Sequence, residues 1–223
     1  MKKRFFGGGI FIVPVLFFAF FLFSCADSSP ELSEVNPYLV LEFEEQKALS
    51  DSFLSVFVKM PHDSRRAESF VVKSLDDKHK IGWKIEEPGV FDVDGEEFVY
   101  ALRLCHQENQ QLPKGKFTLF YKDAGGQEVE IDFDFSYEDA LIFSSKDDIS
   151  SLIAQKTENL ALYDENNALI FFGKAKTAWK TDSDIKKDMK TAESKRIVLY
   201  SKDSQIIVLF PVEKLEDSEE KNE

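Results

Sequence analysis

The sequence is poor in the residues that build most metal sites and covalent catalytic sites. It has two cysteines, Cys25 and Cys105, and three histidines, His62, His79 and His106. No two histidines have the spacing of a zinc-binding helix or knuckle, and no cysteine pair completes such a site. A Gly-x-Ser-x-Gly elbow and a phosphate-binding glycine loop are also absent from the sequence. We therefore predict no metal, no cofactor and no catalytic residue, and an exported hydrolase with a dispersed active site is kept as the alternative.

The first 24 residues have the three parts of a secretory signal peptide. Lys2, Lys3 and Arg4 form a basic start, an uncharged apolar run covers residues 5–23, and small and polar residues follow. The basic residues would stay on the cytoplasmic side while the apolar run enters the bilayer as a helix. Because the run is close to the roughly 20 residues that span a bilayer, an uncleaved membrane anchor is the alternative.

The segment Leu22-Phe23-Ser24-Cys25 resembles the lipobox of bacterial lipoproteins, where a leucine stands three residues before an obligatory cysteine and a small residue directly before it. Phe23 departs from the commonest pattern, in a way that is similar to spirochaete lipoproteins. The resemblance implies cleavage before Cys25, a diacylglycerol thioether on its sulfur, and usually an acyl chain such as palmitate on the new amino terminus. A cysteine placed at the end of the apolar run favours this interpretation over an uncleaved anchor. We expect a protein anchored by its lipid in the cell envelope, on the periplasmic face of a membrane or on the cell surface.

The charge of the expected mature chain is strongly negative. Without the first 24 residues, 25 Lys and Arg stand against 41 Asp and Glu, which gives a net charge of −16. Contacts with phosphates need clustered Lys and Arg, so nucleic acid is excluded as the expected partner. The same charge disfavours adhesion to anionic lipid, and the lipid on Cys25 must then hold the protein at the membrane. The 22 phenylalanines make the chain too apolar to be disordered.

Residues 37–137 show the alternation of apolar and polar residues that is typical of β-strands. A turn at residues 123–126 separates a strand at 116–121 from one at 128–135, in which acidic and apolar residues alternate strictly. About seven short strands with turns between them predict an immunoglobulin-like antiparallel β-sandwich. The Leu-Pro-x-Gly corner and aromatic strand of residues 112–121 also resemble the penultimate strand of bacterial immunoglobulin-like domains. The Cys–Trp–Cys arrangement of antibody domains is absent, so this resemblance implies the architecture alone.

Two short features of this region could suggest chemistry. Asp92, Asp94 and Gly95 have the carboxylates and the glycine of a calcium loop, but the rest of the EF-hand pattern is missing, so an Asp-Gly turn between two strands is favoured. Cys105 and His106 are neighbours on a strand-like run, where adjacent side chains point to opposite faces and disfavour a nucleophilic dyad. We expect Cys105 to be a small buried side chain.

Residues 138–215 combine two hairpins, at 159–172 and 196–210, with a helix expected over 184–195. This β-β-α-β-β order predicts a small α+β domain. The expected division of the chain is a signal peptide at 1–24, a flexible tether at 25–36, a β-sandwich at 37–137, an α+β domain at 138–215 and an acidic tail at 216–223.

Trp179 lies between Lys176 and Lys180 in an expected loop. Tryptophan and basic side chains contribute much of the energy at interfaces, and here they interrupt an acidic sequence. The alternative is that Trp179 covers the hairpin at Phe171-Phe172 as part of the core. We predict a non-enzymatic binding or assembly module in which Trp179, Lys176 and Lys180 contact a protein partner in the envelope.

Overall fold

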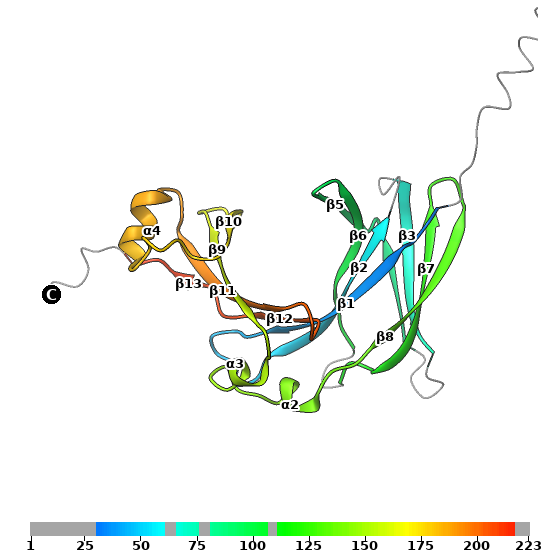
Figure 1. The fold of residues 1–223 in the computed structure, drawn as a ribbon, viewed down its shortest axis with the longest axis horizontal. Coiled ribbons are helices and arrows are strands. Elements are labelled where there is room, and N and C mark those ends of the chain that lie inside the picture. Colours follow the sequence, from blue (N-terminus) through cyan, green and yellow to red (C-terminus); the bar gives the residue numbers. More distant parts are fainter. Residues whose placement is uncertain (1–29, 61–65, 76–80, 107–110, 217–223) are drawn as a thin grey trace, which may run out of the picture.

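The computed structural model describes residues 30–60, 66–75, 81–106 and 111–216. The described part of the chain is mainly β, with 53% of its residues in strands and 9% in helices, which confirms the predicted fold class. The strands form two sheets (Figure 1). The larger sheet has the order β10-β9-β11-β12-β1-β2-β6-β5, with β13 paired to β11, and the smaller has the order β4-β3-β7-β8.

The elements have the following bounds. The larger sheet consists of β1 (Glu34–Glu42), β2 (Asp51–Met60), β5 (Gly89–Val93), β6 (Glu96–Leu104), β9 (Thr157–Tyr163), β10 (Leu169–Gly173), β11 (Ser194–Ser201), β12 (Ile206–Leu209) and β13 (Glu213–Lys214). The smaller sheet consists of β3 (Ala67–Ser74), β4 (Gly82–Glu86), β7 (Gly115–Asp123) and β8 (Glu128–Phe135). The helices are α2 (Asp139–Ile142), α3 (Ile149–Leu152) and α4 (Asp182–Asp188).

The main hydrophobic core lies between the two sheets. Alternate residues of β1 and β2, such as Leu41 and Val56, are fully buried there together with Phe117 of β7. Leu141 of α2 and Ile149 of α3 belong to the same cluster. β8 confirms the predicted alternation, because its acidic side chains are exposed while its apolar side chains are buried or half-buried. Removing these apolar side chains from water is what drives the two layers together.

The larger sheet continues across the expected boundary at residue 137. β12 pairs in parallel with β1, so that Leu39 lies opposite Ile206 and Leu41 lies opposite Val208. All four side chains belong to one core cluster. The elements after residue 157 do follow the predicted order, β9-β10-α4-β11-β12, but their strands extend the same sheet. A separate α+β domain is therefore not confirmed, and the division at residue 137 stays a prediction.

Two expected boundaries are corrected. β1 begins at Glu34 and pairs there with β2, so residues 34–36 of the expected tether belong to a strand. α4 spans Asp182–Asp188 and not the predicted 184–195. It begins earlier because Thr181 caps it, with its hydroxyl accepting a hydrogen bond from the backbone nitrogen of Asp184 at 3.2 Å. It ends earlier because the chain joins β11 at Ser194 and pairs with β9.

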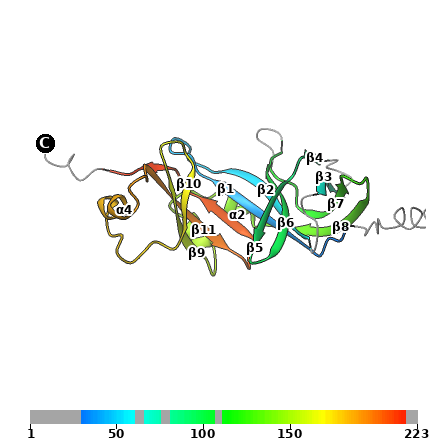
Figure 2. The same cartoon turned by 90° about the horizontal axis from the view of Figure 1, so that it is seen from above.

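The molecule is elongated, with α4 at one end and the smaller sheet at the other (Figures 1 and 2). β1 begins at the end that carries the smaller sheet. The edge strands β10 and β5 both rise on the side of the larger sheet that is opposite α2 and α3, so the sheet is curved (Figure 1). Within the described ranges, no helix has the length and apolar character needed to cross a bilayer. The lipobox and the apolar run of residues 5–23 lie outside these ranges.

Candidate functional site

The candidate site lies on the concave face of the larger sheet, which points away from α2 and α3 and which we call the outer face. Side chains of a strand alternate between the two faces of its sheet. In β1, Leu39 and Leu41 enter the core, so Tyr38, Val40 and Glu42 point to the outer face. The cross-strand partners of these three residues bring further side chains to the same surface.

Aromatic side chains form a continuous row on the outer face. Adjacent ring centroids are 5.9 Å apart for Tyr200 and Tyr38, 5.7 Å for Tyr38 and Phe57, and 6.0 Å for Phe57 and Tyr100. The hydroxyl oxygens of Tyr38 and Tyr200 are 3.1 Å apart and form a hydrogen bond. Burial and this bond raise the pKa of Tyr38 above its usual range. The aromatic row comprises Tyr200 of β11, Tyr38 of β1, Phe57 of β2, Phe98 and Tyr100 of β6, and Phe91 of β5.

No described helix or strand lies over the aromatic row (Figure 1). Tyr38 is 9% exposed because its neighbours crowd it. The other rings of the row are half-buried. A contiguous apolar surface that no layer of the same chain covers is typical of an interaction site.

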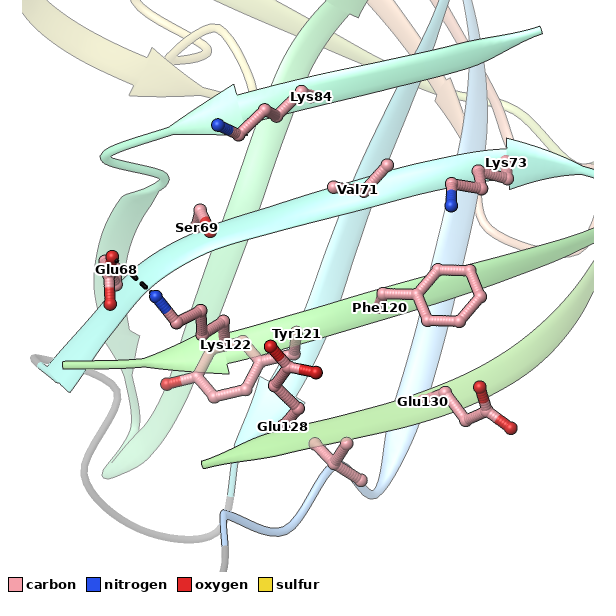
Figure 3. Close-up of a pocket in the computed structure, with 11 residues that line it drawn as sticks. Glu68, Ser69, Val71, Lys73, Lys84, Phe120, Tyr121, Lys122, Glu128 and Glu130 are labelled. Atoms are coloured by element: carbon pink, nitrogen blue, oxygen red, sulfur yellow. Dashed lines mark hydrogen bonds and ion pairs between the residues drawn. The ribbon is translucent and has the colours of Figure 1, made fainter. Parts of the chain in front are cut away.

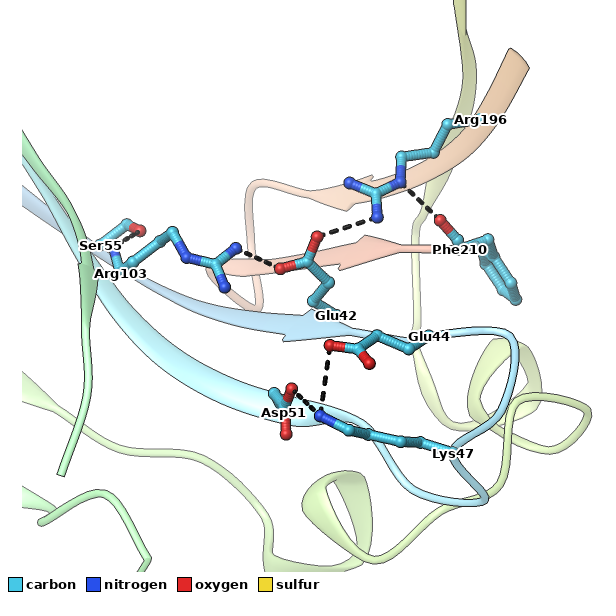
Figure 4. A network of polar contacts seen from close by, with 8 residues as sticks. All are labelled: Glu42, Glu44, Lys47, Asp51, Ser55, Arg103, Arg196 and Phe210. Atoms are coloured by element: carbon cyan, nitrogen blue, oxygen red, sulfur yellow. Dashed lines mark hydrogen bonds and ion pairs between the residues drawn. The ribbon is translucent and has the colours of Figure 1, made fainter. Parts of the chain in front are cut away.

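Glu42 is held between two arginines at one side of the row (Figure 4). Its Oε1 accepts a hydrogen bond from Nη2 of Arg196 at 2.8 Å, and its Oε2 accepts one from Nη1 of Arg103. Burial pushes the pKa of Glu42 upward, but the hydrogen bonds from both guanidinium groups outweigh burial and lower it. Glu42 therefore stays ionised, and these three residues, the Glu42 network, carry a net charge of +1.

Arg103 reaches this position through an irregularity in β6. The register between β2 and β6 shifts between Leu54 and Val56, and Arg103 has a φ of 58°, in the left-handed region. Its guanidinium carbon lies 4.2 Å from the centroid of the Phe53 ring, within range of a cation–π interaction. β-Bulges often redirect a side chain next to a functional site. Here the bulge places a cationic side chain, 59% exposed, beside the aromatic row.

The residues predicted to bind a partner lie elsewhere, near α4. Trp179 is 9% exposed and packs edge-to-face on Phe171, with ring centroids 4.9 Å apart. Its Nε1 donates a hydrogen bond to Oδ2 of Asp188 at 2.9 Å, and Nζ of Lys176 binds the same oxygen at 2.8 Å. The structure thus supports the alternative interpretation, in which Trp179 is part of the core. A binding role for Trp179, Lys176 and Lys180 stays a prediction.

Two hollows of the surface lack the character of a ligand site. One, of about 260 Å³, lies beside Trp179 and is lined by side chains of both charges, including Lys180, Asp182 and Lys195. The other, of about 610 Å³, lies on the solvent side of the smaller sheet, around Phe120 (Figure 3). In this second hollow Lys122 forms an ion pair with Glu68 at 2.9 Å. Both hollows are open to solvent, and charged side chains stand among the apolar ones of their lining, which favours solvation over the enclosure of a small ligand.

The remaining sequence motifs do not form a chemical site. Asp92, Asp94 and Gly95 make the predicted turn between β5 and β6, with Asp94 and Gly95 at φ of 55° and 80°. Cys105 is exposed because β6 ends at Leu104, so the expectation of a buried side chain was wrong. Among the described residues, no three His, Cys, Asp or Glu side chains are grouped as a metal site. His62 and His79 lie outside the described ranges.

Sequence reasoning missed the Glu42 network and the aromatic row. Leu102-Arg103-Leu104 looks like an ordinary alternation, and nothing in it signals a bulge. Comparison with known proteins adds no further assignment, because no protein-family model matches the chain and no curated protein is significantly similar to it.

Proposed function

We propose that this chain is a lipid-anchored, non-enzymatic binding module of the cell envelope that holds a protein partner on the outer face of its larger sheet. The observation that carries the proposal is the aromatic row, which no described element covers. Tyr, Trp and Arg are enriched among the few residues that supply most of the energy at protein interfaces, and the row contains three tyrosines.

The direction of β1 fits an anchor at Cys25. A fully extended chain between Cys25 and Glu34 spans at most roughly 30 Å. β1 begins at the end of the molecule that carries the smaller sheet, and α4 lies at the opposite end. Lipid on Cys25 would keep the smaller sheet close to the membrane and leave the outer face accessible farther from it.

The anchor is tested by replacing Cys25→Ser in the full chain. We expect incorporation of labelled palmitate to be lost and the precursor to remain uncleaved or the protein to leave the membrane fraction. Equal labelling of both proteins would show that the lipobox interpretation is wrong.

The binding surface is tested by site-specific photocrosslinking in intact envelopes. A photoreactive side chain at position 57 on the outer face should give one discrete adduct, and the same group at position 120 on the smaller sheet should not. Phe120 is a matched control because it is 36% exposed and belongs to the other sheet. A Tyr200→Ala substitution should abolish the adduct at position 57. Equal crosslinking at both positions, or an adduct at position 57 that persists in the Tyr200→Ala variant, would contradict the proposal.

A further inference from the structure

The Glu42 network leaves part of the Arg103 guanidinium available. Nη1 of Arg103 donates to Glu42, while Nε and Nη2 have no hydrogen-bond partner within the described parts of the chain. Nε and Nη2 form the edge of a guanidinium that binds a carboxylate with two parallel hydrogen bonds. Because the ring of Phe53 supports one face of the group and Glu42 holds one nitrogen, this edge is oriented before any ligand arrives.

The charges around Arg103 favour an anion. Glu42 is shared with Arg196, so the two arginines exceed the one carboxylate by a single positive charge. Asp51 lies opposite Glu42, on the side away from the aromatic row, and it is paired with Lys47 at 2.7 Å. Lys47 also pairs with Glu44 at 3.2 Å. Lys47, Glu44 and Asp51 together carry a net charge of −1 and are paired with one another, whereas Arg103 shares its single carboxylate with Arg196. Among these groups, Arg103 is therefore the one that has a charge left to offer to an anion.

An extended segment that lies along β1 matches the outer face of that strand. Tyr38 and Val40 are alternate residues of β1 and stand roughly 6.6 Å apart, the spacing of side chains i and i+2 of an extended chain. Along β1, Tyr38 and Glu42 are separated by roughly 13 Å, which is about four residues of extended chain. The aromatic row crosses the strands, so a segment along β1 crosses the row at Tyr38, places apolar side chains at i and i+2 on this face, and reaches Arg103 with an acidic residue two to four positions away.

We infer that Arg103 recognises a carboxylate side chain on an extended, apolar segment of a partner protein that lies along β1 and crosses the aromatic row. This inference rests on the proposed function and names the chemistry of the partner. Charge complementarity at Arg103 selects the acidic residue, and the apolar outer face of β1 with the rings beside it selects the apolar pair. Arg103 is then the residue that determines specificity.

The test selects peptides on the full-length protein held in phosphatidylcholine nanodiscs. A random heptapeptide display library is panned on it, and the enriched peptides are resynthesised with a fluorescent label for anisotropy measurements. We expect an aromatic or aliphatic pair at i and i+2 with an acidic residue two to four positions away. Exchanging that acidic residue for its amide should weaken binding at least tenfold, and binding of the acidic peptide should fall as salt is raised.

Variants separate the inference from the proposed function. Arg103→Gln should weaken binding of the acidic peptide at least tenfold and leave binding of the amide peptide unchanged. Arg103→Lys should give an intermediate loss of affinity, and it serves as the control for folding. Lys122→Gln, on the smaller sheet, should have no effect. If Phe57→Ser abolishes binding but Arg103→Gln does not change it, the inference fails and the proposed function stands. If neither substitution changes binding, or if no peptide is enriched, the inference and the proposed function both fail. Arg103-dependent binding of a uronic-acid oligosaccharide in place of peptides would also overturn the inference.

Discussion

Replacing Trp179→Ala decides between the two interpretations of the region around α4. The indole is 9% exposed and belongs to a small cluster with Leu162 and Ile185, apart from the main core. Truncating a buried tryptophan to alanine costs about 3–5 kcal/mol, because the transfer free energy is lost and a cavity remains. The edge-to-face contact with Phe171 places the expected loss in the upper half of that range.

The assay is urea unfolding followed by circular dichroism, with a thermal scan beside it. For a chain of this size each kcal/mol lowers the midpoint by about 2–4 °C, so we expect a drop of roughly 10 °C or more. Trp179→Phe should recover most of the loss, because it keeps an aromatic ring against Phe171. Phe172→Ala is the matched control: this side chain is 56% exposed on the adjacent strand, and its loss should change stability by about 0.5 kcal/mol or less.

A loss below about 0.5 kcal/mol for Trp179→Ala would refute this reasoning and would favour Trp179 as a contact residue. A large loss leaves only Lys176 and Lys180 as candidates near α4. Their replacement by glutamine should leave the fold intact, so partner capture can be measured without interference from unfolding.

Further predictions concern the Glu42 network, the division of the chain and one turn. Glu42→Gln should cost about 2–4 kcal/mol at pH 7 in urea unfolding, because it leaves two arginines without their carboxylate. The folded state lowers the pKa of Glu42, so its contribution is complete above about pH 4.3 and is lost as the pH falls through the folded value; an equal cost at pH 7 and pH 3 would contradict this. Residues 37–137 alone should lose cooperative melting in circular dichroism, because β1 then lacks β12 and the core lacks Ile206 and Val208; a melting point close to that of the whole chain would show an independent domain. Gly95→Ala should lower stability by about 1 kcal/mol through its φ of 80° alone, since no atom of the described residues lies within 4 Å of the added methyl group, and an unchanged melting point would show that this strain is negligible.

The features that could be predicted from the sequence are local. The strand β8 was predictable because its acidic and apolar residues alternate strictly, and the sheet exposes the acidic side chains and buries or half-buries the apolar ones. The Asp94-Gly95 turn was predictable because both residues tolerate a positive φ. In each case the signal lies within a few residues of the structure that it determines.

The features that escaped prediction depend on distant parts of the chain. The parallel pairing of Leu39 with Ile206 joins residues with no local signal between them, and that pairing turns two expected domains into one continuous sheet. Trp179 was predicted to be a contact residue because lysines surround it in sequence. In the structure the ammonium group of Lys176 lies 4.9 Å from the centre of the indole ring, so a charged neighbour covers a buried side chain.

The composition of β1 gives a final argument for a partner on the outer face. Tyr38-Leu39-Val40-Leu41 is an uninterrupted apolar run, which is typical of a strand that is covered on both faces. The core covers Leu39 and Leu41, and no described layer lies over Tyr38 and Val40, whose exposures of 9% and 8% come from crowding within one curved sheet. Tyr38 and Val40 are thus shielded by their neighbours, but the half-buried rings of Phe57, Tyr100 and Tyr200 keep apolar surface in water, where it has no compensating contact. The apolar residues on that face are explained if another protein covers it, and the half-buried rings beside them are where its contact would be made.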